Sequence, residues 1–84
     1  MSATLQREYW NGEPTRLGEL FRVATTRGEK QLTAVCGLWT HHLGWEVRLE
    51  VNGDLQRSEV LRSQDDVLTA GETWKAAMVA KGWQ

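Results

Sequence analysis

Residues 44–81, GWEVRLEVNGDLQRSEVLRSQDDVLTAGETWKAAMVAK, decide the fold of this chain. Every second residue in the first part of this stretch is apolar: Trp45, Val47, Leu49 and Val51. Charged residues stand between them, and a period of two predicts a strand with one buried and one solvated face. Asn52-Gly53 follows and favours a reversal of the chain, because both residues tolerate a positive φ. The stretch therefore begins with a β-hairpin.

Charge predicts the length of the hairpin loop. A two-residue loop would place Glu46 opposite Glu59 and Arg48 opposite Arg57, which sets like charges together twice. A four-residue loop over residues 52–55 would instead pair Arg48 with Glu59. Directly opposed pairs contribute roughly 0.2–1 kcal/mol each. The charges thus favour the longer loop, whereas the Asn-Gly pair itself favours the shorter one.

The end of the stretch has the features of an amphipathic helix. Ser63 and Asp66 resemble a capping box, which predicts that the helix begins just after Ser63. Small and apolar residues then recur at three- and four-residue steps: Val67, Ala70, Gly71, Trp74, Ala77 and Met78. This spacing makes one apolar stripe along the helix. Gly82 suits the left-handed residue that ends a helix, and Trp83 would then fold back onto Met78.

Two further strands are predicted upstream, over residues 19–26 and 32–39. A turn at residues 27–30 would place Phe21 opposite Cys36, and the apolar faces of the two strands would then coincide. A four-residue loop over residues 40–43 would place Trp39 opposite Gly44, again with apolar faces matched. Since a slip of one residue would turn every side chain to the other face, this agreement supports the pairing.

The predicted fold is therefore a single α+β domain. A four-stranded antiparallel meander sheet would carry one C-terminal helix on its apolar face, as a two-layer sandwich. Residues 18–84 would form this sheet-plus-helix domain. Residues 1–17 would form an N-terminal arm or a short edge strand, since Pro14 argues against a central strand.

Composition bounds the environment and the function classes. The 84 residues carry a formal net charge of −1 and a single cysteine, which predicts no internal disulfide and fits a reducing compartment. The first residues show no signal-peptide pattern, and no stretch approaches the ~20 apolar residues of a membrane span. We expect a cytoplasmic protein with no membrane association.

No motif points to catalysis, a cofactor or a metal. His41-His42 with Cys36 nearby offers neither the ligand number nor the spacing of a zinc site. Cys36 falls on the predicted buried face, where a thiol is a poor nucleophile. No glycine-rich phosphate-binding pattern is present. We expect a protein that is not an enzyme and has no cofactor.

The other sheet face has no second layer in the sequence. We expect four apolar residues among its polar ones: Trp39, Val35, Leu20 and Leu61. An exposed apolar group of this kind marks a contact site, unless the N-terminal arm with Tyr9 and Trp10 folds over it. The first interpretation predicts a protein that acts through contacts at this face, either by self-association as a homo-oligomer or with a protein partner.

A second interpretation comes from a resemblance. An antiparallel sheet followed by one helix, with Trp45-Glu46-Val47-Arg48, a turn, Arg57 and a helix carrying Trp74, resembles two DNA-binding families. These are the arm-type domains of phage integrases and the plant ethylene-response domain. The resemblance implies nucleic-acid binding by the open sheet face, with Arg22, Arg48 and Arg57 as contacts. The chain departs from these families on the same face, where Glu46, Glu50 and Glu59 lie between the arginines. A DNA-binding surface needs to be basic to neutralise phosphates.

Overall fold

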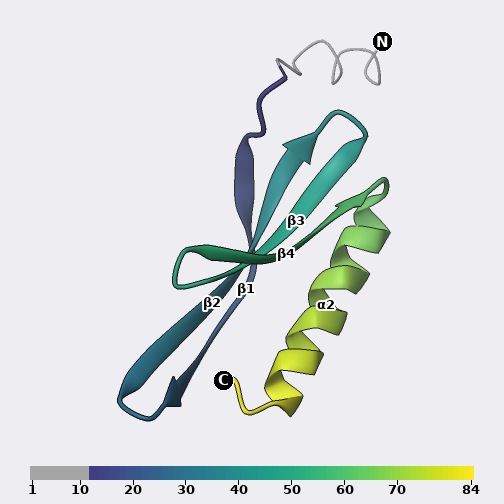
Figure 1. The fold of residues 1–84 in the computed structure, drawn as a ribbon. Helices are drawn as coiled ribbons and strands as arrows, with labels where there is room; N and C mark the ends of the chain where they lie inside the picture. Colours follow the sequence, from purple (N-terminus) through teal and green to yellow (C-terminus); the bar gives the residue numbers. More distant parts are fainter. Residues whose placement is uncertain (1–11) are drawn as a thin grey trace.

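The computed structural model describes residues 12–84 and contains four strands and one helix (Figure 1). The elements in chain order are β1 (Arg16–Arg27), β2 (Lys30–His41), β3 (Gly44–Val51), β4 (Asp54–Leu61) and α2 (Gln64–Ala80). The strands form one antiparallel sheet in the order β1-β2-β3-β4. The predicted α+β meander with a C-terminal helix is confirmed.

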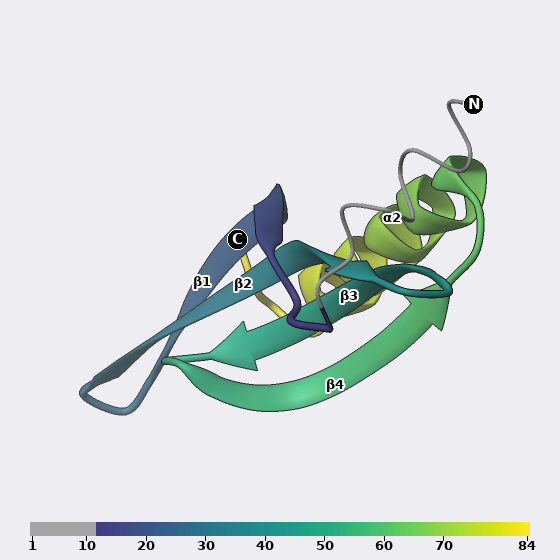
Figure 2. The same cartoon turned by 90° about the horizontal axis from the view of Figure 1, so that it is seen from above.

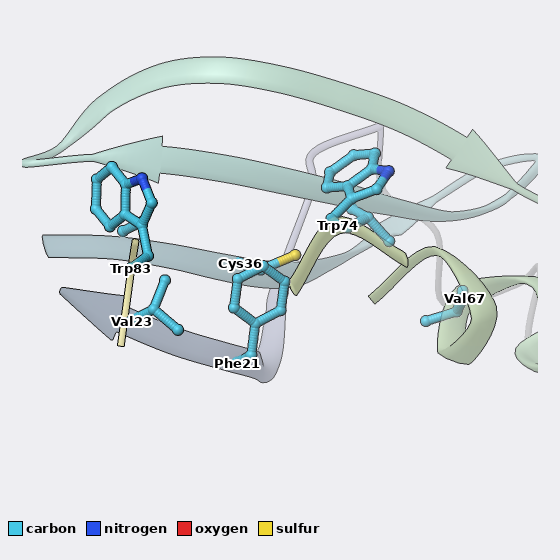
Figure 3. Close-up of a cluster of buried hydrophobic side chains, with 8 residues drawn as sticks. Phe21, Val23, Cys36, Val67, Trp74 and Trp83 are labelled. Carbon is cyan, nitrogen blue, oxygen red and sulfur yellow. The ribbon is translucent and has the colours of Figure 1, made fainter. Parts of the chain in front are cut away.

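The helix lies along one side of the twisted sheet (Figure 2). Buried side chains from the two layers form the core between them. The buried core residues come from β1, β2, β3, α2 and the segment after the helix: Phe21, Val23, Ala34, Cys36, Val47, Val67, Trp74 and Trp83. Figure 3 shows the indole rings of Trp74 and Trp83 beside Cys36, Phe21 and Val23. Two large aromatic rings thus supply much of the apolar area that a short chain otherwise lacks.

The first hairpin has the predicted register, with Phe21 opposite Cys36 and Thr26 opposite Gln31. The strand is longer than predicted and begins at Arg16. A register shift between Glu19 and Phe21 makes Leu20 an extra residue, as in a β-bulge. A bulge interrupts the alternation of faces, and the side chain of Leu20 consequently lies on the helix side.

The pairing of β2 with β3 differs from the prediction by two residues. His41 lies opposite Gly44, so that the loop contains only two residues, and Cys36 lies opposite Leu49. Because the shift is two residues, every side chain keeps its predicted face. The predicted four-residue loop is wrong, whereas the predicted buried face of both strands is correct.

The predicted four-residue loop between β3 and β4 is also wrong. Val51 lies opposite Asp54, and the loop consists of Asn52 and Gly53, both with positive φ. A bulge follows at Gln56, since Glu50 pairs with Leu55 but Leu49 pairs with Arg57. The extra residue avoids the like-charge pairs that the short loop would otherwise create.

This bulge reverses the predicted faces of β4 beyond Gln56. Glu59 lies opposite Val47 and Leu61 opposite Trp45, so both share the helix side with these residues. Val60, which the longer loop placed on the helix side, lies on the opposite face. One residue of register decides the face of the whole strand.

The helix begins and ends as predicted. The Ser63 hydroxyl accepts a hydrogen bond from the Asp66 N–H at 3.1 Å. At the other end the Trp83 N–H donates to the Met78 carbonyl, and the Gly82 N–H donates to the Val79 carbonyl. These two bonds form a Schellman motif, which directs Trp83 back into the core.

No helix among residues 12–84 is long and apolar enough to cross a membrane. The predicted N-terminal arm, residues 1–17, lies mostly outside the described residues. The prediction that Tyr9 and Trp10 cover the open face also falls on residues outside the described range. The last two residues of the arm, Arg16 and Leu17, already belong to β1.

Candidate functional site

The candidate site is the sheet face opposite the helix, called here the open face. Residues that lie directly opposite each other in an antiparallel sheet share a face, and the observed registers therefore define its members. The open face carries Arg16, Glu19, Arg22, Ala24, Thr33, Val35, Gly37, Trp39, Glu46, Arg48, Glu50, Leu55, Ser58 and Val60. Among residues 12–84 no helix or strand covers it (Figure 2).

Trp39 occupies the centre of the open face between Gly37 and Arg48. A Cβ atom on Gly37 would lie 3.3 Å from the Trp39 indole nitrogen and 3.6 Å from the Nε of Arg16. The missing side chain of Gly37 thus lets the indole and a guanidinium lie close to the sheet. Arg48 stacks over the indole ring, with its guanidinium carbon 4.3 Å from the ring centroid. The ring is held from two sides.

The indole N–H of Trp39 is buried, and no residue between 12 and 84 accepts a hydrogen bond from it. Buried donors without an acceptor cost roughly 1–3 kcal/mol. Such groups are rare in folded proteins. The position of the Trp39 ring thus leaves this indole N–H without an acceptor among the described residues.

Ion pairs fix the arginines around Trp39. The Arg48 Nε and Nη2 donate to the Glu46 Oε1 at 3.0 and 2.8 Å, and both side chains are less than a third exposed. Arg22 donates to both carboxylate oxygens of Glu19 at 3.2 and 2.7 Å, and Arg16 lies 3.8 Å from the same carboxylate. The hydrogen bonds from Arg22 lower the pKa of Glu19 and raise the pKa of Arg22 itself. The open face consequently pairs its three arginines with glutamates.

The structure places only part of the predicted contact set on this face. Trp39 and Val35 lie on it as expected. The prediction for Leu20 is wrong: the bulge at this residue directs its side chain to the helix side, where it lies against Gly71. The prediction for Leu61 is also wrong, because this residue lies opposite Trp45 on the helix side and packs against the core.

The predicted nucleic-acid set is divided between the two faces. Arg22 and Arg48 lie on the open face, but each is bound to a glutamate. Arg57 lies on the helix side, with its guanidinium carbon 4.1 Å from the Trp74 ring centroid. The open face therefore lacks the cluster of available cations that phosphate binding requires.

The two histidines and the cysteine do not form a metal-binding cluster among the described residues. His41 and His42 stack on each other at 4.7 Å, and the His41 Nδ1 accepts a hydrogen bond from the Leu43 N–H. Cys36 is fully buried on the helix side, and burial raises the pKa of its thiol to about 11. Within residues 12–84 no three His, Cys, Asp or Glu side chains lie close enough together to hold a metal ion.

Gly37 and Arg16 are not among the site residues that the sequence predicts. Gly37 could have been recognised from the sequence, since a glycine inside a predicted strand often marks the close approach of another group. Arg16 has no such signal, because it precedes the predicted strand, which begins at residue 19. No family model, curated protein or solved structure matches this chain.

Proposed function

We propose that this chain is a small cytoplasmic, non-enzymatic protein that acts by binding a protein through the open face, with Trp39 at the centre and Val35 beside it. The observation that carries the proposal is the seating of Trp39. Its ring lies between Gly37 and Arg48 on a face that no described element covers.

The composition of the face supports a protein as the ligand. Interface hot spots are enriched in Trp and Arg, and they lie centrally within a polar rim. Trp39 and Arg48 stand in the centre, with Val35 and Val60 nearby, and glutamates and arginines surround them. A ring that is already fixed loses little conformational entropy on binding.

The charges disfavour nucleic acid as the ligand. The open face holds three arginines and three glutamates: Arg16, Arg22, Arg48, Glu19, Glu46 and Glu50. A phosphate would have to displace a carboxylate that is already hydrogen-bonded to each of two arginines, Arg22 and Arg48. A protein surface with its own apolar centre meets no such competition.

Site-specific photo-crosslinking in the source cells tests the proposal. A photoreactive amino acid replaces Val35 on the open face, and a matched variant carries it at the exposed Lys75 of α2. We expect a discrete protein adduct from position 35 that position 75 does not give. Mass spectrometry then shows whether the adduct contains a second copy or another protein, and nuclease digestion identifies a nucleic-acid adduct.

A second variant tests whether Trp39 carries the contact. Trp39→Ala in the position-35 background should reduce the adduct several-fold while the circular dichroism spectrum stays unchanged. Equal adducts from positions 35 and 75, or an adduct that nuclease removes, would refute the proposal.

A further inference from the structure

The outer edge of β4 is the second exposed feature of this sheet. β4 pairs only with β3, and all of its residues except Leu61 are exposed. No hydrogen bond within residues 12–84 joins its outer backbone to another segment. The opposite edge differs, because the Gln84 N–H donates to the Ala24 carbonyl of β1 at 2.8 Å. We propose that β4 pairs antiparallel with β4 of a second copy of this chain.

The charges of β4 select one register for this pairing. A two-fold axis through Ser58 places Arg57 opposite Glu59 of the second copy, and Glu59 opposite Arg57 of the second copy. An axis through Arg57 would set two arginines opposite each other, and an axis through Glu59 would set two glutamates together. Opposite charges favour a cross-strand pair and like charges oppose it. The register centred on Ser58 is therefore preferred.

Both charges are available for this contact. Neither Arg57 nor Glu59 takes part in an ion pair with a described residue, whereas the arginines of the open face are all close to a glutamate. Arg57 stacks on the Trp74 ring, which holds its guanidinium on the helix side of β4. Glu59 shares that side, because it lies opposite the buried Val47. The two side chains thus project from the same side of the strand, as reciprocal pairing requires.

The bulge at Gln56 limits the pairing to the residues after it. In the resulting assembly the axis is perpendicular to the sheet, and the two four-stranded sheets join into one of eight strands. Both helices then lie on one side, and the two open faces form one continuous surface on the other. This arrangement occupies the edge and leaves Trp39 accessible, and it is independent of the function proposed above.

Charge reversal with sedimentation velocity at low salt tests the pairing. Wild type should change from monomer to dimer as its concentration rises from micromolar to millimolar. Arg57→Glu and Glu59→Arg alone should each weaken the dimer at least tenfold, because each sets like charges together twice. An equal mixture of the two variants should restore it, since every contact then joins opposite charges. Lys75→Glu and Glu72→Arg on the exposed side of α2 make the same charge changes and should have no effect.

Cysteine pairing provides a test that leaves Arg57 in place. Ser58→Cys lies on the proposed axis and should form a disulfide with its own copy in a glutathione buffer, whereas Val60→Cys should form it much more slowly. Cys36 is buried and should stay reduced. A wild-type monomer at all concentrations, a dimer insensitive to both reversals, single-variant losses that the mixture does not restore, or equal disulfide rates at positions 58 and 60 would each overturn the pairing. The open-face crosslink from position 35 can succeed or fail separately.

Discussion

The stacking of Arg48 on Trp39 predicts an energetic coupling between these two residues. Arg48→Met keeps the length and the apolar stem of the side chain but removes the guanidinium. Trp39→Leu removes the ring beneath it. If the guanidinium is attracted to the ring, the double variant loses less stability than the two single losses together.

The structure sets the size of this coupling. A cation–π contact contributes about 0.5–1 kcal/mol at exposed sites and about 2 kcal/mol when desolvated. The Arg48 side chain is 26% exposed, and we therefore expect about 1 kcal/mol between Arg48 and Trp39. The two hydrogen bonds to Glu46 act on the same guanidinium, and we expect a similar coupling of about 1 kcal/mol with Glu46→Gln. Only the second coupling should fall strongly in high salt.

Urea unfolding of the four proteins in each cycle measures both couplings. Arg22→Met serves as the control, because Arg22 lies on the same face but bonds to Glu19. Its coupling to Trp39 should be close to zero. An Arg48–Trp39 coupling below about 0.3 kcal/mol, the usual error of additivity, would refute the view that Arg48 holds the ring in place.

Three further predictions concern the fold that supports the open face. Gly71→Ala should stabilise the protein in urea by about 0.5 kcal/mol, since the helix gain of about 1 kcal/mol exceeds the cost of shifting the end of Leu20; a loss of stability would mean that Leu20 cannot move. Gly82→Ala should lower the free energy of unfolding by about 1 kcal/mol, because alanine is strained at φ +100; an unchanged value would contradict the role given to the Schellman turn. Burial raises the pKa of Cys36 to about 11, and its stabilising contribution should be complete below pH ~9 and decline by about 2–3 kcal/mol as the pH rises through about 11. Unfolding of wild type and Cys36→Ala at several pH values isolates this decline, and parallel curves would refute it.

The strands and the helix could be predicted because hydrophobic periodicity specifies which side of each element is buried. Cys36, Val47 and Val67 are all buried as their spacing indicated. The same signal cannot fix registers that differ by two residues, since both keep every side chain on its face. This ambiguity explains the wrong loop length between β2 and β3.

The bulges at Leu20 and Gln56 were not predictable from periodicity. An extra residue in one strand turns all the residues after it to the other face of the sheet. The sequence of that strand alone does not show where this happens, because the bulge is defined by the pairing with the neighbouring strand. The errors at Leu61 and Arg57 all follow from the single bulge at Gln56.

The candidate site was predicted in part for the same reason. Trp39 and Val35 follow from the alternation within β2 alone. The stack of Arg48 on Trp39 depends on register, because Arg48 pairs with Gly37 and is thus a diagonal neighbour of Trp39. In the predicted register Trp39 lies opposite Gly44, so that Arg48 is too far along the strand to contact the ring.

The hydrogen bond from Gln84 to Ala24 makes the two borders of the sheet unequal, with a consequence for stoichiometry. A sheet whose two borders could join each other would add chains without end and form a filament. Pairing of β4 with itself consumes both reactive borders at once, and only β1 borders then face outwards. The bond to Gln84 already occupies one carbonyl of that border. A chain that pairs through β4 alone therefore stops at two copies, whereas growth into a filament would also require β1 borders to pair with each other.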